Sequence, residues 1–379
     1  MPEGIWEEDR VEIDRGFYIY CGGALERLKE MPSGAVNCCV TSPPYWGLRD
    51  YNNSNQLGLE KTPEEYVGKC VEIFREVRRV LCSLGTLWLV IGDCYAVSGR
   101  GGGGSFEGER VGWQTIKGKR IERGQGRYGG GNNVVEYCKA KDLVGIPWML
   151  AFALRADGWY LRSDIVWSKP NAMPESCKDR PTRTHEYVFL LSKSKQYYYD
   201  WEAVQEDSVA GHSSGNGFKR DARLSYRDKN GARSNDQEWV PKGDSFKRAG
   251  SKRGVEHLGK QATHREERED VEYNGPKRNR RDVWSVNTKP YRGAHFAVYP
   301  EKLIEPCVIA GCPPGGTVLD PFIGSGTTGI VAMQNGRRCV GVELNPEYID
   351  IAYSRYTEAK GKWAGGEGTV PGVPKGVEP

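Results

Sequence analysis

Two short stretches, Val36–Val40 and Thr86–Ile91, constrain the fold most, because each is a largely continuous apolar run of strand length. A strand that packs on one side only alternates apolar and polar residues. The strands of a parallel sheet are covered by helices on both faces and are apolar throughout. The two stretches therefore predict a parallel α/β sheet.

A long helix is expected between these two strands. Thr62 suits the N-cap, Pro63 suits the first helical position, and Glu65 completes a capping box. Apolar residues recur at helical spacing as far as Leu84, and Gly85 is expected to end the helix. A strand, a helix and a second strand in this order form the repeating unit of a parallel sheet.

Shorter elements are expected on both sides of this unit. The patterns predict strands at Phe17–Tyr20, Tyr160–Trp167 and Glu186–Leu191, and helices at Ala24–Lys29 and Pro147–Ala156. Regular α/β structure is expected again from Tyr299 to about Tyr356.

Basic charge is concentrated in two segments without apolar periodicity. Residues 98–133, which are rich in glycine, carry a net charge of +4, and residues 211–282 carry +6, whereas the whole chain carries only +4. The rest of the chain is therefore mildly acidic. A folded body with basic appendages suits a polyanion such as nucleic acid, although solvated loops without a partner would show the same charge.

The 11 cysteines and 5 histidines show no spacing typical of metal ligands. We expect free, mostly buried thiols and no metal. The N-terminus lacks the basic start and apolar run of a signal peptide, and no stretch approaches the roughly 18 apolar residues of a membrane helix. A cytoplasmic protein without membrane association is expected.

A glycine-rich motif, Asp320-Pro-Phe-Ile-Gly-Ser-Gly-Thr-Thr328, follows a predicted strand that ends at Asp320. Its glycines let a ligand lie against the backbone at the carboxyl end of the strand, and Thr327 or Thr328 can cap the next helix. The following strand ends at Glu343, which is placed to accept hydrogen bonds from both hydroxyls of a ribose. Because Gly329 completes a G-x-G-x-x-G spacing, this motif alone also fits a nucleotide-dependent oxidoreductase.

A second motif, Ser42-Pro-Pro-Tyr45, follows the strand Val36–Val40 directly. Pro43 and Pro44 fix a rigid turn, so that the Ser42 hydroxyl and the Pro43 carbonyl can hold the two hydrogens of an aromatic amine. Tyr45 offers a flat face on which a flipped base can stack. Acceptors on the amine hydrogens localise the nitrogen lone pair and point it at a methyl sulfonium, so that no covalent intermediate is needed.

Together these motifs resemble the catalytic and cofactor motifs of amino-DNA methyltransferases. The order, with the catalytic motif first, resembles the circularly permuted beta group of that family. The resemblance covers residues 17–95, 140–200 and 284–356. It implies a doubly wound, mostly parallel seven-stranded sheet, S-adenosylmethionine as cofactor, double-stranded DNA as substrate, and a cognate restriction endonuclease as a candidate partner. The residues that it assigns to catalysis are Ser42, Pro43, Pro44 and Tyr45, and those that it assigns to the cofactor are Asp320, Pro321, Phe322, Gly324, Gly326, Thr327, Thr328 and Glu343.

The resemblance also suggests the division of the chain. Residues 1–97 and 134–199 form the catalytic half, and residues 284–360 form the cofactor half. Between them lie the mobile basic loop at 98–133 and a target-recognition region at 200–283, and a disordered tail follows at 361–379.

One position departs from the family pattern. The family often has Gly-Asp before the first short helix, where the acid helps to hold the adenine of the cofactor. Here the sequence is Cys21-Gly-Gly-Ala24, so that Gly23 stands in the place of the acid. The departure leaves open which residue contacts the adenine.

Several alternatives remain at this point. Serine before the two prolines resembles the cytosine-N4 enzymes and favours cytosine, but a hydroxyl could also serve adenine N6. Protein or RNA amide methyltransferases carry Asn-Pro-Pro-Tyr and have the reverse motif order, and a non-catalytic DNA-binding descendant would have no need of Ser42 or Tyr45. Pro306-Cys307 is similar to the nucleophile motif of carbon-5 cytosine methyltransferases, but its position inside a predicted helix indicates a buried core cysteine.

Overall fold

The computed structural model describes residues 10–47, 56–96, 138–139, 141–207, 277–289 and 298–364. Residues Met1–Val204 and Arg280–Pro379 form one compact unit, and Gln205–Asn279 form a second. In the described part of the second unit, β7 (Glu206–Asp207) pairs with β8 (Lys277–Arg278) in an antiparallel sheet. An ion pair between Arg278 and Glu206, 3.0 Å long, joins the two strands.

The described part of the first unit contains a sheet of nine strands, rather than the seven expected. Their order is β1 (Arg10–Asp14), β2 (Phe17–Cys21), β11 (Arg338–Glu343), β10 (Thr317–Asp320), β3 (Val36–Thr41), β4 (Leu81–Ile91), β6 (His185–Ser192), β5 (Tyr160–Ser168) and β9 (Val283–Ser285). The seven inner strands match the prediction, and only β6 among them runs antiparallel to its neighbours. The two additional strands, β1 and β9, lie at the edges, where short and partly polar sequences can pair without being buried.

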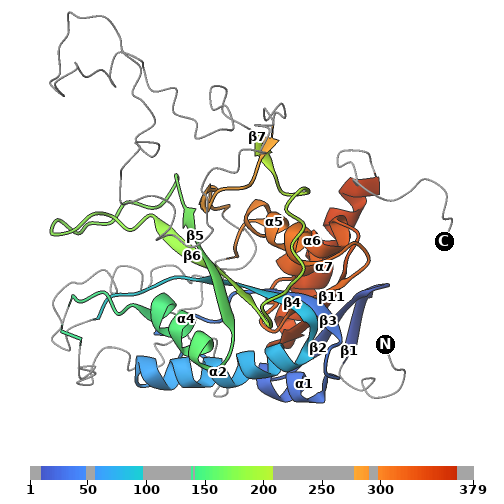
Figure 1. The fold of residues 1–379 in the computed structure, drawn as a ribbon, viewed down its shortest axis with the longest axis horizontal. Coiled ribbons are helices and arrows are strands. Elements are labelled where there is room, and N and C mark those ends of the chain that lie inside the picture. The colour runs from blue at the N-terminus through green and yellow to red at the C-terminus, as the bar shows by residue number, and fades with distance from the viewer. Residues whose placement is uncertain are drawn as a thin grey trace, which may run out of the picture. The chain divides into compact units, whose positions relative to one another are not determined.

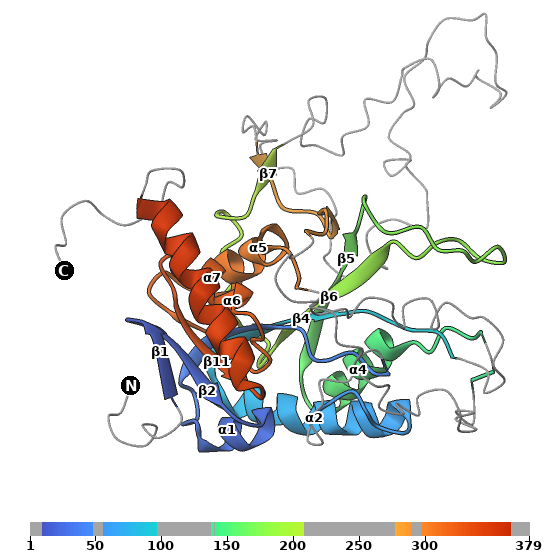
Figure 2. The same ribbon diagram turned by 180° about the vertical axis from the view of Figure 1, so that it is seen from behind.

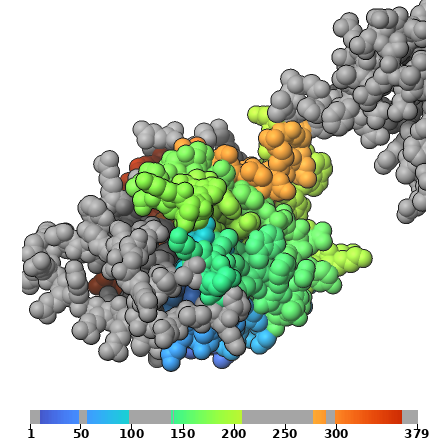
Figure 3. All heavy atoms as spheres, turned by 90° about the vertical axis from the view of Figure 1, so that its left-hand side faces the viewer, coloured from blue at the N-terminus to red at the C-terminus, as the bar shows by residue number. Residues whose placement is uncertain are grey.

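Helices cover both faces of this sheet, as the predicted doubly wound architecture requires (Figures 1 and 2). One face carries α1 (Ala24–Glu30), α2 (Pro63–Val80) and α4 (Ile146–Ala156), and the other carries α5 (Glu301–Gly311), α6 (Thr327–Gln334) and α7 (Pro346–Ala364). The buried apolar residues accordingly form two clusters, one on each side of the sheet. On the side of the molecule shown in Figure 3, α4, β5 and β6 form much of the described surface, with α2 below them.

Helix α2 begins as predicted but ends earlier. The Thr62 hydroxyl accepts a hydrogen bond from the Glu65 amide, which confirms the cap. The helix ends at Val80 instead of Gly85, because Leu81 is buried and already pairs with Val36 as the first residue of β4. Tertiary pairing therefore overrides a helical pattern that continues in the sequence.

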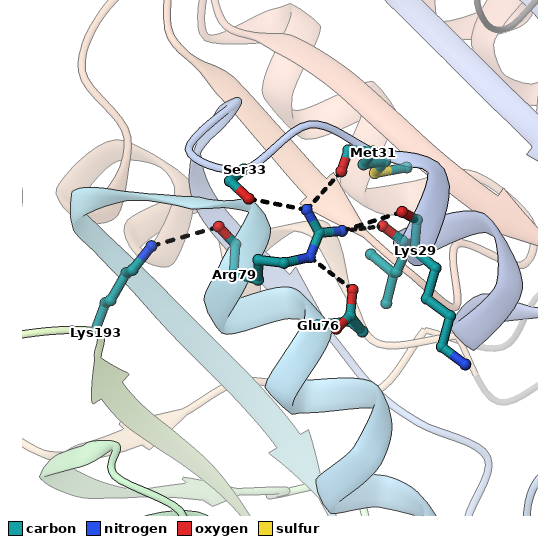
Figure 4. Close-up of polar contacts among 7 residues, drawn as sticks. Lys29, Met31, Ser33, Glu76, Arg79 and Lys193 are labelled. Atoms are coloured by element: carbon teal, nitrogen blue, oxygen red, sulfur yellow. Dashed lines mark hydrogen bonds and ion pairs between the residues drawn. The ribbon is translucent and has the colours of Figure 1, made fainter.

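Arg79 anchors this end of α2 to the end of α1 (Figure 4). Its guanidinium donates to the carbonyls of Leu28 and Met31, at 2.6 and 2.7 Å, and to the Glu76 carboxylate at 2.7 Å. The arginine thus gives a further donor to the Leu28 carbonyl, which also accepts the Met31 amide, and a donor to the Met31 carbonyl at the end of α1. The Lys193 ammonium in turn donates to the Arg79 carbonyl at 3.4 Å.

Several predicted features lie outside the described residues. These are the basic loop at 98–133, nearly all of the basic segment at 211–282, and most of the tail. Helix α7 continues to Ala364, four residues beyond the boundary at which the tail was expected to begin. Within the described ranges, no helix is long and apolar enough to cross a membrane.

Candidate functional site

The two sequence motifs meet at the carboxyl ends of adjacent parallel strands. The Ser42-Pro-Pro-Tyr45 motif follows β3, the glycine-rich motif follows β10, and these strands are hydrogen-bonded neighbours in parallel register. Thr41, the last residue of β3, donates to the carboxylate of Asp320, the last residue of β10, at 2.6 Å. In open α/β sheets, ligands bind in the crevice outside these strand ends.

A cavity of about 1450 Å³ opens at this edge of the sheet. Pockets for a single small molecule measure roughly 300–1,000 Å³, so this cavity has room for a cofactor and part of a second ligand. Nine of the twelve predicted site residues line it: Ser42, Pro43, Pro44, Tyr45, Pro321, Phe322, Gly324, Thr327 and Glu343. The other three, Asp320, Gly326 and Thr328, do not line it.

Asp320 lies behind the cavity wall and organises it. Its fully buried carboxylate accepts hydrogen bonds from the hydroxyls of Thr41, Tyr299 and Thr328, at 2.6, 3.0 and 2.5 Å, and from the Phe322 amide at 3.0 Å. Burial raises the pKa of the carboxyl, and the four donors oppose that shift. The aspartate therefore holds the glycine-rich loop against β3 and α6 without reaching the cavity.

The glycines of this loop are required by its backbone. Gly324 and Gly326 have φ values of +50° and +83°, which other residues rarely adopt. A side chain at Gly326 would also come within 2.8 Å of Ala352 in α7. Gly326 itself is the N-cap of α6, so the prediction that Thr327 or Thr328 caps this helix is wrong; Thr328 is turned to Asp320 instead.

Glu343 ends β11 beside the glycine-rich loop. Its carboxylate accepts hydrogen bonds from the amides of Gly324, at 2.9 Å, and Asn345, at 2.8 Å. Burial raises the pKa of this carboxyl to about 7 in spite of these donors. The two backbone contacts fix an acceptor at the cavity wall, where a ligand hydroxyl can share it.

The catalytic loop is fixed from two sides. The Tyr66 hydroxyl of α2 donates to the Pro44 carbonyl at 2.9 Å. The Tyr45 hydroxyl donates to the Glu186 carboxylate of β6, also at 2.9 Å. Among the described residues, none donates to the Pro43 carbonyl, so that this acceptor stays available at the cavity.

Sequence reasoning missed the group that holds Tyr45. Glu186 accepts hydrogen bonds from both Tyr45 and the ammonium of Lys169, and that ammonium lies 4.3 Å from the centre of the Trp167 ring. All of these side chains line the cavity, as does Asn171. Burial raises the pKa of the Tyr45 phenol well above its usual range, with the Glu186 charge adding to the shift, so the ring stays neutral. The sequence holds no signal for Glu186, because strand pairing alone brings it to Tyr45.

The cysteines match their prediction. All 11 are free, and most are buried. Cys307 is fully buried inside α5, and burial raises the pKa of its thiol, as expected for a core residue rather than a nucleophile. Across the described residues, no group of three or more side chains could hold a metal ion.

Comparison with known proteins agrees with this arrangement. The family model of the N6 and N4 methyltransferases, described as DNA methylase, matches residues 36–354. The type II methyltransferase M.Cfr9I of Citrobacter freundii is 44% identical, over 93% of this chain and 91% of its own length. M.SmaI of Serratia marcescens is 42% identical, over 90% of this chain and 91% of its own.

A solved structure shows the same fold. The cytosine-N4-specific PvuII DNA methyltransferase matches 93% of both chains with a TM-score of 0.52 at 16% identity, a level that supports likeness of fold alone. The family model and the two type II relatives extend over most of the chain and include both motifs. The chain therefore belongs to the N6/N4 family of DNA methyltransferases, which use S-adenosylmethionine as methyl donor.

Proposed function

We propose that this enzyme transfers a methyl group from S-adenosylmethionine to the exocyclic N4 of a cytosine that is flipped out of duplex DNA. One observation carries the proposal: the loops after β3 and β10, adjacent strands, line a single cavity. A methyl donor held by the loop after β10 and an amine held by the loop after β3 would then meet inside this cavity. Base flipping is how enzymes that modify bases reach an atom buried in the duplex.

The residues present at the second loop fit the cofactor. Gly324 leaves the backbone bare, since a side chain there would meet only the Phe322 carbonyl, at 4.0 Å. Phe322, Pro321 and Thr327 line the cavity around it. Glu343 offers a carboxylate to the ribose, while Asp320, Gly326 and Thr328 act indirectly by fixing the loop. When bound, the cofactor supplies an electrophilic methyl on a sulfonium.

The residues at the first loop are suited to hold the amine. The Ser42 hydroxyl and Pro43 carbonyl would accept its two hydrogens, and Pro44 keeps the turn rigid. Tyr45 would stack on the base, with its ring fixed by Glu186. Held in this way, the amine nitrogen would be oriented to accept the methyl group that the cofactor supplies, and it would then lose one proton to solvent.

Serine at position 42 favours cytosine as the target. A hydroxyl can turn to accept from the amine, whereas the aspartate or asparagine that resembles adenine-N6 enzymes is absent. Methylation of adenine N6 by the same mechanism is the second candidate, because both targets are aromatic amines.

The partners follow from the same proposal. Duplex DNA is the expected substrate, read by the region at 200–283. M.Cfr9I and M.SmaI carry type II names, so a cognate restriction endonuclease is proposed as the companion activity.

The decisive experiment incubates unmethylated DNA with the protein and S-adenosylmethionine that carries a deuterated methyl, and then analyses the nucleosides by mass spectrometry. Labelled N4-methylcytosine is expected. Labelled N6-methyladenine would keep the reaction and replace the base. The absence of any label, with cofactor binding intact, would favour a non-catalytic DNA-binding protein.

A further inference from the structure

Glu26, in the first turn of α1, has no role in the proposal above, yet it lines the same cavity as Phe322 and Glu343. Its side chain is exposed, and among the described residues none forms a hydrogen bond or an ion pair with its carboxylate. A free acceptor therefore lies at the wall of the cofactor cavity.

The pairing of β2 with β11 places Glu26 near one end of the bound cofactor. Cys21 at the end of β2 pairs with Glu343, and the Gly22 amide donates to the Glu343 carbonyl at 2.9 Å. The glycine-rich loop follows β10, on the opposite side of β11. With the ribose at Glu343 and the methionine portion toward the glycine-rich loop and the catalytic loop, the adenine extends across the end of β2, where α1 begins.

The Glu26 carboxylate lies against the open side of Gly23. Gly23 has φ −69° and ψ 139°, a conformation open to any residue, so its backbone does not require glycine. A Cβ atom there would lie 2.1 Å from Glu26 Oε2, and the three nearest atoms all belong to the Glu26 carboxyl group. The carboxylate of Glu26 thus occupies the space that a side chain at position 23 would fill.

We infer that Glu26 accepts a hydrogen bond from the exocyclic amine of the adenine of S-adenosylmethionine, and so replaces from α1 the acid that is absent at position 23. The inference rests on the cofactor orientation proposed above. The adenine amine is a donor that matches a carboxylate. A hypoxanthine ring carries a carbonyl at the same position, which would face the carboxylate without a proton.

Binding of two ligands to the full chain tests this contact without turnover. Calorimetry measures the affinity for S-adenosylhomocysteine and for S-inosylhomocysteine, which differ only in the purine. A hydrogen bond to a charged acceptor changes affinity by about tenfold or more. The wild-type protein is therefore expected to prefer the adenosyl ligand by about tenfold, and Glu26→Ala to lose that preference by weakening the adenosyl ligand alone.

Two variants complete the design. Glu30→Ala changes another exposed glutamate of α1, one that pairs with Arg27 and does not line the cavity, and should keep the wild-type preference. Gly23→Asp combined with Glu26→Ala restores an acid in the vacated space and should recover the preference.

Three outcomes would overturn the inference. These are a wild-type protein that binds both ligands equally, a Glu26→Ala protein that keeps the wild-type ratio, and a Glu26→Ala protein that weakens both ligands alike. A wild-type protein that binds neither ligand would instead contradict the proposed cofactor pocket itself, and the inference with it.

Discussion

Burial raises the pKa of the Glu343 carboxyl to about 7, so its proposed role in holding the ribose must depend on pH. An ionised carboxylate accepts from both ribose hydroxyls, whereas a protonated one loses an acceptor site. Affinity for S-adenosylhomocysteine should therefore fall by about tenfold between pH 8 and pH 6. Calorimetry across this range measures the effect, and a flat profile for the wild type would contradict it.

Glu343→Gln serves as the control, and it should bind the ligand more weakly and with no dependence on pH in this window.

The raised pKa of Glu343 also predicts how the stability of the ligand-free protein depends on pH. The folded state holds the Glu343 proton up to about pH 7, whereas the unfolded state releases it near 4.5. The contribution of this group to stability is therefore present below pH 4.5 and is lost as the pH rises to 7.

Ser42 and Tyr45 belong to the proposed chemistry of the base and should be separable from cofactor binding. Ser42→Ala removes a polar contact to the reacting amine and should lower kcat on the order of 100-fold. Tyr45→Ala removes the stacking face, worth roughly 1–3 kcal/mol, and should lower kcat by roughly 10- to 100-fold. The affinity for S-adenosylhomocysteine should stay unchanged. Ser354→Ala, on α7, is the matched control, and wild-type turnover in both variants would refute the assignment.

Most of the candidate site could be predicted from the sequence, because its residues lie in two local motifs that follow strands. What could not be predicted depends on partners distant in the chain. Asp320 was expected to contact the cofactor, but Thr41 and Tyr299 surround it and turn it into a buried anchor. Glu186 reaches Tyr45 only because β6 pairs with β4, and no local pattern marks that pairing.

At the scale of single elements, the start of α2 offers a direct test of a sequence signal. Thr62→Ala removes the side-chain acceptor of the Glu65 amide and should lower the free energy of unfolding by about 1 kcal/mol. Denaturant unfolding measures the loss, and Thr62→Ser, which keeps the hydroxyl, should be close to the wild type. An alanine variant as stable as the wild type would show that this cap contributes nothing.

The start of α2 was easier to predict than its end. Thr62 and Pro63 act within a few residues, so their signal is complete in the local sequence. The end of α2 depends on the pairing of Leu81 with Val36, which the helical pattern does not contain. The edge strand β1 is exposed over most of its length, so it lacks the apolar run by which the inner strands were found.

At the scale of the whole molecule, the sheet is assembled from two distant parts of the chain. Strands β2 and β3 are consecutive in this sheet's N-terminal part, yet β11 and β10 from the C-terminal part lie between them. The catalytic loop and the cofactor loop become neighbours only through this insertion. Although the catalytic motif and the cofactor motif lie far apart in the chain, both can therefore line a single continuous cavity.

This interleaving makes a strong prediction about the two parts when they are separated. A polypeptide of residues 1–204 lacks the centre of its sheet, and one of residues 280–379 lacks both flanking strands, so neither should unfold cooperatively alone. Produced together, the two should assemble and bind S-adenosylhomocysteine. A ligand concentration of 100 times Kd should then stabilise the assembly by about 2.7 kcal/mol. Thermal unfolding with and without ligand tests each polypeptide and the mixture. A cooperative transition of residues 1–204 alone would mean that β2 and β3 can form a folded sheet without β10 and β11, and that the cofactor half docks onto it as a separate domain.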